Sequence, residues 1–184
     1  MALIESNPFE LGKKAPDFNL PDVLSNSQKS LSELKGEKAT VIMFICNHCP
    51  FVLHVNDGLV KLANKYIGKG ISFIAISSND AIQYPQDGPE QMKAVALALN
   101  YPFPYLYDQS QEIAKAYDAT CTPDFYVFDH NLKSIYHGQL DDSRPGNGLP
   151  VTGSFIQKAI EHLLAGKGEK VLQKPSIGCS IKWK

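Results

Sequence analysis

Two cysteines separated by two residues stand where the sequence changes character. Cys46 and Cys49 follow an unbroken apolar run, residues 39–45, and precede a stretch in which apolar residues recur at helical spacing. Such a run, rich in β-branched and aromatic residues, is typical of a strand buried on both faces. Pro50 fits only in the first turn of a helix, because its missing N–H costs nothing there. The sequence therefore predicts two thiols between a buried strand and the start of a helix.

This position suits thiol–disulfide exchange. The N-terminus of a helix carries unpaired N–H groups and about half a unit of positive charge, which favours a thiolate over a thiol. The two-residue spacer lets the second sulfur reach the first, so a mixed disulfide can be resolved within the chain. We expect Cys46, at the exposed end, to be the attacking nucleophile, and Cys49, one helical turn deeper, to be the resolving thiol. His48 lies between them, and as an imidazolium it would favour the thiolate further.

A metal site is the alternative use of these cysteines. A structural zinc site usually needs four ligands, commonly in two closely spaced pairs. The other two cysteines, Cys121 and Cys179, are isolated, and His54 is the one extra candidate ligand near the motif. The context favours redox chemistry, and we expect no metal and no cofactor.

The composition is that of an ordinary globular domain. The chain has 184 residues, 43% of them hydrophobic, and a formal net charge of -1. This charge argues against a nucleic acid or an anionic membrane as partner, since either would need a basic face. No stretch approaches the roughly 18 apolar residues of a membrane span. The first residues do not show the basic segment followed by an apolar run that is typical of a signal peptide, so we expect none. We expect one domain, residues 1–184, in the cytoplasm, where most thiols are kept reduced.

Strand and helix signals alternate along the body of the chain. Residues 1–14 resemble a loose arm, and residues 167–184 form a tail too mixed in composition to assign. The expected strands are 18–20 and 28–30, as a hairpin, then 39–45, 71–77, 105–107, and a second hairpin of 125–128 with 134–136. The expected helices are a single turn at 32–34, then 51–66, 89–99, 110–117 and 155–164, the last capped by Thr152 or Ser154. This order predicts an α/β sandwich with a mixed sheet.

A further motif, Thr122-Pro123, precedes the second hairpin. Together with Ala15-Pro16-Asp17-Phe18 and the strand that ends in Cys46-Asn47-His48-Cys49, it makes the chain resemble the thioredoxin-like superfamily. The resemblance is to the redoxin or AhpC/TSA group, and within it to a peroxiredoxin-like branch with a CxxC motif. In that branch, stretches like residues 141–146 and 178–183 recur. The resemblance implies a thioredoxin fold, with a mixed central β-sheet flanked by helices, an N-terminal hairpin extension and a C-terminal tail.

The resemblance also implies roles for particular residues. It implies that Pro123 is cis and packs beside the sulfurs, so that the backbone at Thr122 is free to pair with an extended thiol substrate. The expected activity is that of a thiol–disulfide oxidoreductase that reduces or oxidises disulfides through Cys46 and Cys49. Its expected partners are protein or small-molecule disulfides, with a thioredoxin-type reductant as a candidate.

Two other functions stay open. One is a peroxiredoxin-like peroxidase, in which peroxide oxidises a cysteine to sulfenic acid. The peroxiredoxin pattern P-x-x-x-T-x-x-C, placed on Cys49, requires threonine where Cys46 stands and proline where Ile42 stands. The other is a non-enzymatic redox sensor or metal-binding module.

Three further residues have a functional and a structural interpretation. Cys121 lies two residues before Pro123, but a lone cysteine more often serves as a small buried hydrophobe. Cys179, in the tail, is either an extra resolving thiol or part of a docked cap. Arg144 lies in a loop that could line the site, or in a turn with a local ion pair. We expect His137 at the surface.

Overall fold

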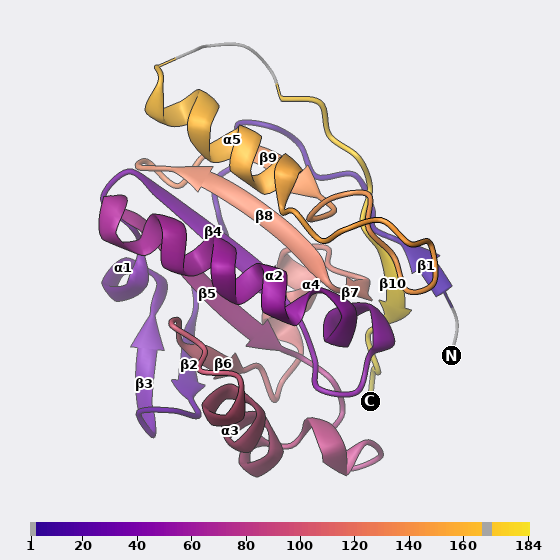
Figure 1. Ribbon diagram of the computed structural model, residues 1–184. Coiled ribbons are helices and arrows are strands. Elements are labelled where there is room, and N and C mark those ends of the chain that lie inside the picture. Colours follow the sequence, from indigo (N-terminus) through magenta and orange to yellow (C-terminus); the bar gives the residue numbers. More distant parts are fainter. Residues whose placement is uncertain (1–2, 167–170) are drawn as a thin grey trace.

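The computed structural model describes residues 3–166 and 171–184. A mixed sheet of seven strands, in the order β3-β2-β6-β5-β4-β8-β9, runs through the middle of the molecule (Figure 1). Its strands are β2 (Asn19–Asp22), β3 (Ser27–Ser30), β4 (Ala39–Phe44), β5 (Ile71–Ser77), β6 (Tyr105–Tyr107), β8 (Asp124–Asp129) and β9 (Ser134–Gly138). The two hairpins expected from the sequence are both present, β2 with β3 and β8 with β9.

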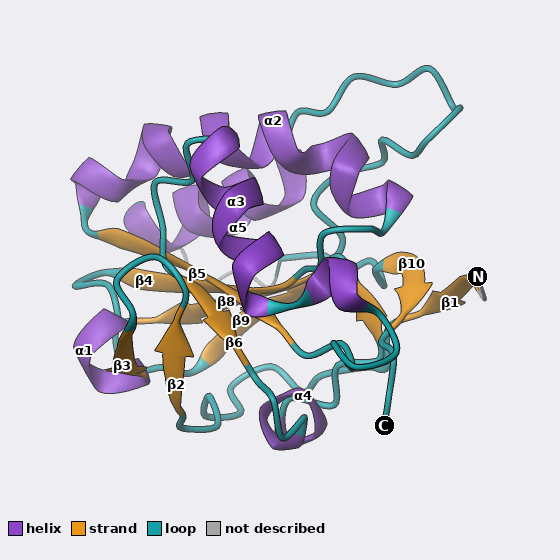
Figure 2. Cartoon of the chain, turned by 90° about the horizontal axis from the view of Figure 1, so that it is seen from below, coloured by secondary structure: helices purple, strands orange, loops and turns teal. Residues whose placement is uncertain are grey.

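Helices cover both faces of this sheet. Figure 2 shows α2, α3 and α5 on one face and the short α1 and α4 on the other. The helices are α1 (Leu31–Leu34), α2 (Pro50–Tyr66), α3 (Pro89–Ala98), α4 (Glu112–Ala116) and α5 (Ser154–Leu164), with 3-10 turns at Ile67–Lys69 and Pro85–Asp87. Among the described residues, no helix has the length and apolar character needed to cross a membrane.

Strand β4 lies in the centre of the sheet and directs the motif that follows it. It pairs in parallel with β5 and antiparallel with β8, and all its residues are buried. Val41 and Met43 belong to the core beneath α2 and α5, whereas Ile42 and Phe44 belong to the core on the opposite face. The unbroken apolar run thus reflects burial on both faces, as the sequence indicates.

A second sheet joins the two ends of the chain. It has the order β1-β10-β7, and its strands are β1 (Leu3–Glu5), β7 (Cys121–Thr122) and β10 (Ile177–Ser180). The expectation of a loose N-terminal arm is wrong for the described part of that arm, because Leu3–Glu5 pairs with β10 and the Phe9 side chain is buried. Residues 1–2 of the expected arm and residues 167–170 of the expected tail lie outside the described residues.

The start of α5 differs from the expectation of a Thr152 or Ser154 cap. The residue before the helix is Gly153, at φ +67°, and no side chain of its own caps the helix. Instead, the Asp141 carboxylate accepts the N–H groups of Thr152 and Gly153, at 2.6 and 2.7 Å. The cap therefore comes from a residue eleven positions upstream, which a local capping pattern cannot reveal.

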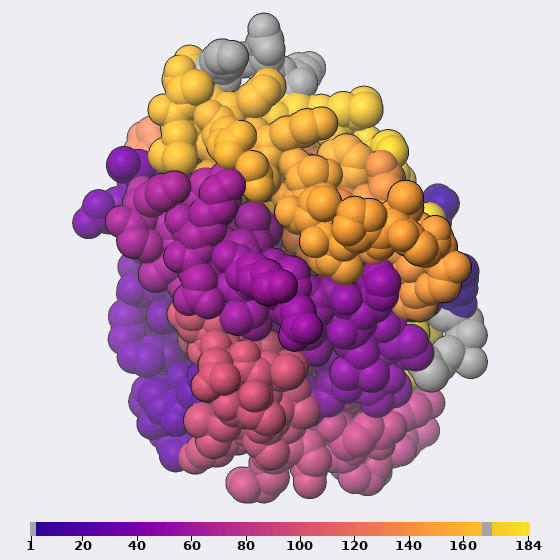
Figure 3. All heavy atoms as spheres, in the orientation of Figure 1, coloured from indigo at the N-terminus to yellow at the C-terminus, as the bar shows by residue number. Residues whose placement is uncertain are grey.

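The loop between β9 and α5 packs against the first half of α2, as the orange and purple surfaces in Figure 3 show. Gly58 in α2 leaves space for this loop, since a Cβ there would lie 2.4 Å from Val151 Cγ1. His54 Nε2 and Ser143 Oγ, 2.7 Å apart, join the same two segments. The helix that carries the motif is thus covered along one side.

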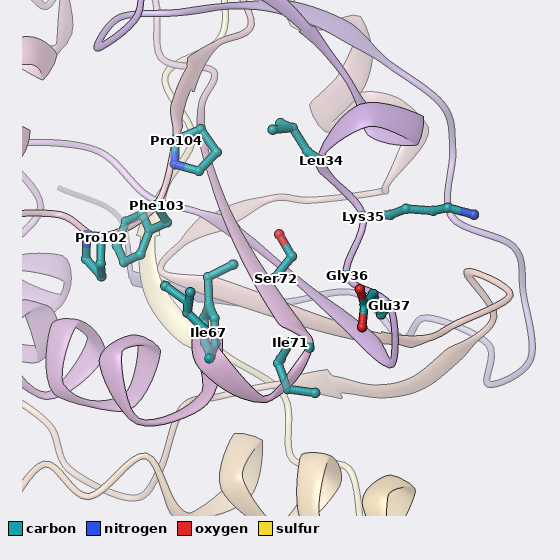
Figure 4. A pocket seen from close by; sticks show the side chains of 13 residues that line it. Leu34, Lys35, Gly36, Glu37, Ile67, Ile71, Ser72, Pro102, Phe103 and Pro104 are labelled. Carbon is teal, nitrogen blue, oxygen red and sulfur yellow. The ribbon is translucent and has the colours of Figure 1, made fainter.

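A surface hollow of about 460 Å³ lies at the far end of the sheet (Figure 4). Its lining includes Ile67, Ile71 and Phe103. Because β4 and β5 are parallel, this hollow is at their amino ends, whereas Cys46 follows the carboxyl end of β4. Its lining contains no cysteine or histidine, so none of the expected site residues lies in it.

Candidate active site at the cysteine pair

The cysteine motif and the Thr122-Pro123 motif meet where the two sheets meet. Cys49 is the N-cap residue of α2, with Pro50 in the first turn, as the sequence indicates. The Thr122-Pro123 peptide bond is cis, as the resemblance implies. Cys46 Sγ lies 3.4 Å from Thr122 Oγ1, and Cys49 Sγ lies 3.2 Å from the Thr122 carbonyl oxygen. The structure therefore brings Cys46, Cys49, Thr122 and Pro123 together.

Both thiols are buried. Cys46 is 2% exposed and Cys49 is 0% exposed. The expectation that Cys46 sits at an exposed end is therefore wrong. Segments distant in sequence lie against it, since Thr122 Oγ1 is 3.4 Å from Cys46 Sγ and a carboxylate oxygen of Asp87 is within 4.8 Å of that sulfur.

The thiolate is favoured at Cys49 rather than at Cys46. A hydrogen bond from the Cys46 thiol lowers the pKa of Cys49 most, burial opposes it, and the Cys179 thiol and the Val52 N–H assist, with a net value of about 5. The same bond raises the pKa of Cys46 well above its ordinary value, and burial and the charge of Asp87 raise it further. The two sulfurs thus titrate as a unit in which one proton leaves readily and the other is retained.

The His48 ring is held by a buried carboxylate. Its Nδ1–H donates to Asp87 Oδ2 at 2.5 Å, and Asp87 is fully buried. The carboxylate also accepts the Asn47 N–H at 2.8 Å and the Asn79 side-chain amide at 2.7 Å. The imidazole is therefore paired with an acid that itself disfavours a thiolate on Cys46, which differs from the role expected for His48.

Asp87 is the residue that the sequence interpretation missed. It lies in the irregular stretch 79–88, which carries no helix or strand period that would place a buried acid. Cys46, His48 and Asp87 offer ligand atoms within 4.8 Å of one another. These three donors, a thiol, an imidazole and a carboxylate, are the ones that could hold a transition metal.

Cys179 lies against the pair, although 130 residues separate it from Cys49 in sequence. Its Sγ is 2.8 Å from Cys49 Sγ, and β10 places it directly opposite Thr122. Cys121 pairs with Ser180 instead, on the other face of the strand from Thr122, and it is fully buried. Burial raises the pKa of the Cys121 thiol.

Arg144 is held by its own loop. Its guanidinium donates to the carbonyl oxygens of Asp141 and Ser143, at 2.8 and 2.7 Å, and to the Gln139 side chain. With Pro123 and Ile177 it lines a cavity of about 10 Å³, the size of one water molecule. The structure thus places Arg144 behind the cis-proline, with its hydrogen bonds directed to its own loop.

A buried polar cluster supports the strand that follows the cis-proline. His137 Nε2 lies 3.0 Å from both carboxylate oxygens of Asp124, and the Tyr126 hydroxyl donates to Asp124 Oδ2 at 3.0 Å. His137 is 4% exposed, so the expectation of a surface position is wrong. His137 is buried because it is a hydrogen-bond partner of the buried Asp124 carboxylate, which needs such partners.

Comparisons with known proteins agree on the family and the fold. The AhpC/TSA family model matches residues 11–137. An uncharacterized conserved protein from Geobacillus kaustophilus is 63% identical, with 100% of this chain and 97% of the other covered and a TM-score of 0.97. A hypothetical protein from Sinorhizobium meliloti 1021 is 46% identical, with 98% of each chain covered and a TM-score of 0.94.

More distant structures share the fold alone. The thioredoxin domain of a thiol-disulfide oxidoreductase from Bacteroides vulgatus is 17% identical, with 83% of this chain and 99% of the other covered and a TM-score of 0.65. No curated protein matches the chain. The predicted thioredoxin fold is therefore confirmed, and since the family model spans more than half of the 184 residues, the chain belongs to the AhpC/TSA family.

Proposed function

We propose that this protein is a thiol–disulfide oxidoreductase that exchanges disulfides through Cys46 and Cys49. The observation that supports this best is the position of Cys49 at the start of α2, with its pKa lowered to about 5, chiefly by the neighbouring thiol of Cys46. A thiolate at neutral pH and a neighbouring thiol that can replace it are the two requirements of this chemistry.

In the reducing direction, the cover over Cys49, which is 0% exposed, has to open before the Cys49 thiolate attacks one sulfur of a substrate disulfide. The bond from Cys49 to that sulfur forms, the substrate disulfide breaks, and the departing thiolate takes a proton from water. Cys46 then attacks Cys49 Sγ and passes its proton to the second substrate sulfur, which leaves as a thiol, so that a Cys46–Cys49 disulfide remains. Two electrons pass from the pair to the substrate, and the sequence-based roles of attacking and resolving thiol are exchanged.

The reduction potential of the Cys46–Cys49 disulfide depends on how strongly the Cys49 thiolate is stabilised. A low pKa favours the reduced form and makes the disulfide more oxidising. A pKa of about 5 for Cys49 lies between those of thioredoxin, about 7, and DsbA, about 3.5. We therefore expect a reduction potential between about −270 and −120 mV.

Reduction of insulin by dithiothreitol tests the proposal. We expect the rate of Cys49→Ser to equal the rate without protein, and Cys46→Ser/Cys179→Ser, which lacks both neighbouring thiols, to accumulate a mixed disulfide that mass spectrometry places on Cys49. Cys121→Ser is the matched control, because Cys121 is equally buried but faces away from the pair. The proposal is wrong if the double variant Cys46→Ser/Cys49→Ser reduces insulin as fast as the wild type.

A peroxidase is the second candidate, and AhpC/TSA membership together with the low pKa of Cys49 favours it. In that reaction the Cys49 thiolate attacks a peroxide oxygen, becomes a sulfenic acid and releases water or an alcohol. Consumption of micromolar hydrogen peroxide with dithiothreitol as reductant distinguishes the two. Turnover that Cys49→Ser abolishes would establish the peroxidase.

A non-enzymatic metal module is the third, supported by the Cys46, His48 and Asp87 donors. Metal analysis of the purified protein tests it, with Asp87→Asn as the variant that removes one charged ligand. A stoichiometric metal that is lost in the variant would favour this role over exchange.

A further inference from the structure

The edge of β7 that a substrate strand would use is occupied by the protein's own strand β10. The cis form of Pro123 leaves the backbone of Thr122 free to pair with an extended segment. In the structure that segment is β10, with Cys179 directly opposite Thr122 and Ser180 opposite Cys121. Figure 1 shows β10 and β1 beside β7, close to the start of α2. The chain thus presents a cysteine of its own where a substrate would lie.

The sulfur atoms are arranged around Cys49. Cys49 stands three residues after Cys46, whose thiol lowers its pKa, and Cys49 Sγ lies 2.8 Å from Cys179 Sγ. The Cys179 sulfur therefore has to move less than about 1 Å to reach the S–S bond length of about 2.05 Å.

The position of Cys179 is fixed by contacts on both sides of it. Before it, a Cβ on Gly178 would lie 2.0 Å from the Thr122 carbonyl oxygen, so that glycine alone allows this approach. After it, the Ile181 N–H donates to the Thr120 carbonyl at 2.8 Å, and the Lys182 N–H donates to Asn79 Oδ1 at 2.9 Å. The contact between the two sulfurs is therefore built into the fold of the C-terminal segment.

We propose that Cys179 is a third redox-active thiol of this site, which takes the disulfide over from Cys46 by attacking Cys49. This inference rests on the proposed function, because the disulfide exchange described above supplies the Cys46–Cys49 disulfide. In the step, the bond between Cys179 Sγ and Cys49 Sγ forms and the Cys46–Cys49 bond breaks. Cys46 leaves as a thiolate and takes up the proton that Cys179 loses. No electrons enter or leave, so the step needs no further oxidant.

The charges of the site favour this order of events. Burial, and then the hydrogen bond and charge of Cys49, raise the pKa of Cys179 to about 12 while the pair is reduced, and Lys182 opposes them. Once Cys49 is part of a disulfide it carries no charge, so the two influences of Cys49 disappear, while burial still raises the pKa of Cys179 and Lys182 still lowers it. Cys179 therefore becomes a better nucleophile at the moment when Cys49 can be attacked.

Two variants treated with dithiobisnitrobenzoate test the proposal. The reagent forms a mixed disulfide with Cys49 and releases one thionitrobenzoate anion. In Cys46→Ser/Cys121→Ser we expect Cys179 to attack that mixed disulfide, release the second anion and leave a Cys49–Cys179 bond that peptide mass spectrometry identifies. In Cys46→Ser/Cys121→Ser/Cys179→Ser we expect the adduct to persist, with the second release slowed at least about tenfold because no oriented thiol is present.

The outcomes separate this inference from the proposed function. An adduct that persists equally in both variants would overturn the role of Cys179 and leave exchange at Cys49 intact. No first release from either variant would overturn the proposed function and this inference with it. On the wild-type chain, oxidised glutathione should give peptides linked both as Cys46–Cys49 and as Cys49–Cys179, and the first linkage alone would contradict the inference.

Discussion

The two sheets of the molecule meet at Thr122 and Pro123 but are stabilised in different ways. The seven-stranded sheet lies between two layers of helices, and its central strand is fully buried on both faces. The small sheet consists of short strands from distant parts of the chain, and its outer strand β1 has Leu3 60% exposed. Hydrophobic burial on both faces stabilises the first, whereas the second adds backbone hydrogen bonds to the burial of a few side chains such as Cys121 and Cys179. We infer that the large sheet is the scaffold and that β10 can leave without unfolding it.

A substitution in the core of the large sheet should lower the free energy of unfolding most. Phe44 is fully buried, and its ring packs against those of Tyr117 and Tyr126. We expect Phe44→Ala to lower the free energy of unfolding by about 3–5 kcal/mol, because it removes a large buried side chain and leaves a cavity. Urea denaturation measures the change.

The matched control for that variant is Leu97→Ala on α3, whose side chain is 61% exposed. Its effect should stay within about 0.5 kcal/mol. A Phe44→Ala protein as stable as this control would show that the large sheet is not the scaffold.

A substitution in the small sheet should lower the free energy of unfolding by a smaller amount. Valine at position 178 would collide with the Thr122 carbonyl and force β10 away from β7. We expect Gly178→Val to cost about 1–3 kcal/mol, as overpacking does. Amide hydrogen exchange should become faster in β1 and β10 while β4 and β5 keep their protection, and Cys179 should become accessible to a thiol reagent.

Gly68→Val is the control, because a Cβ at Gly68 meets no atom within 4 Å. If Gly178→Val instead accelerated exchange equally in β4 and β10, the two sheets would unfold as one unit. The separation between scaffold and cover would then be wrong.

The same contrast explains what the sequence could and could not predict. Strands β4 and β5 and the helix after the motif follow from local apolar periods, and residues 71–77 were placed without error. Strands β1, β7 and β10 have no such period, since their stability comes from pairing across more than 50 residues. The pair of cysteines could be found from spacing and context, because both lie between one strand and one helix.

What surrounds that pair could not be found in this way. Asp87 reaches His48 from a loop about 40 residues away, and Cys179 reaches Cys49 from the tail. The exposure expected for Cys46 failed for the same reason, because it is covered by segments that no local pattern connects to it. A local pattern predicts which group can react but not which distant group modifies it.

The pH at which Cys49 takes up a proton measures how strongly Cys46, which follows the central strand of the large sheet, stabilises the Cys49 thiolate. The lowered pKa of Cys49 means that the thiolate predominates above about pH 5 and takes up a proton below it. Thiolate absorbance in the ultraviolet should therefore rise through a step near pH 5, and the rate of disulfide exchange should fall about tenfold per pH unit below it. We expect Cys46→Ala to move the step to higher pH, because it removes the side-chain donor that lowers the pKa of Cys49 most. A step that stays in place would show that Cys46 does not stabilise the thiolate.

Cys179, in the small sheet, should lower the pKa of Cys49 by less than Cys46 does. The Cys179 thiol is a weaker influence on the pKa of Cys49 than the Cys46 thiol, and the Cys179 backbone N–H, which also lowers this pKa, is kept when alanine replaces the cysteine. We therefore expect Cys179→Ala to raise the midpoint of the absorbance step by less than Cys46→Ala does. A larger shift in Cys179→Ala would invert the comparison, since the small sheet rather than the large one would then hold the reactive charge. In that case release of β10 would deactivate the very sulfur that it exposes.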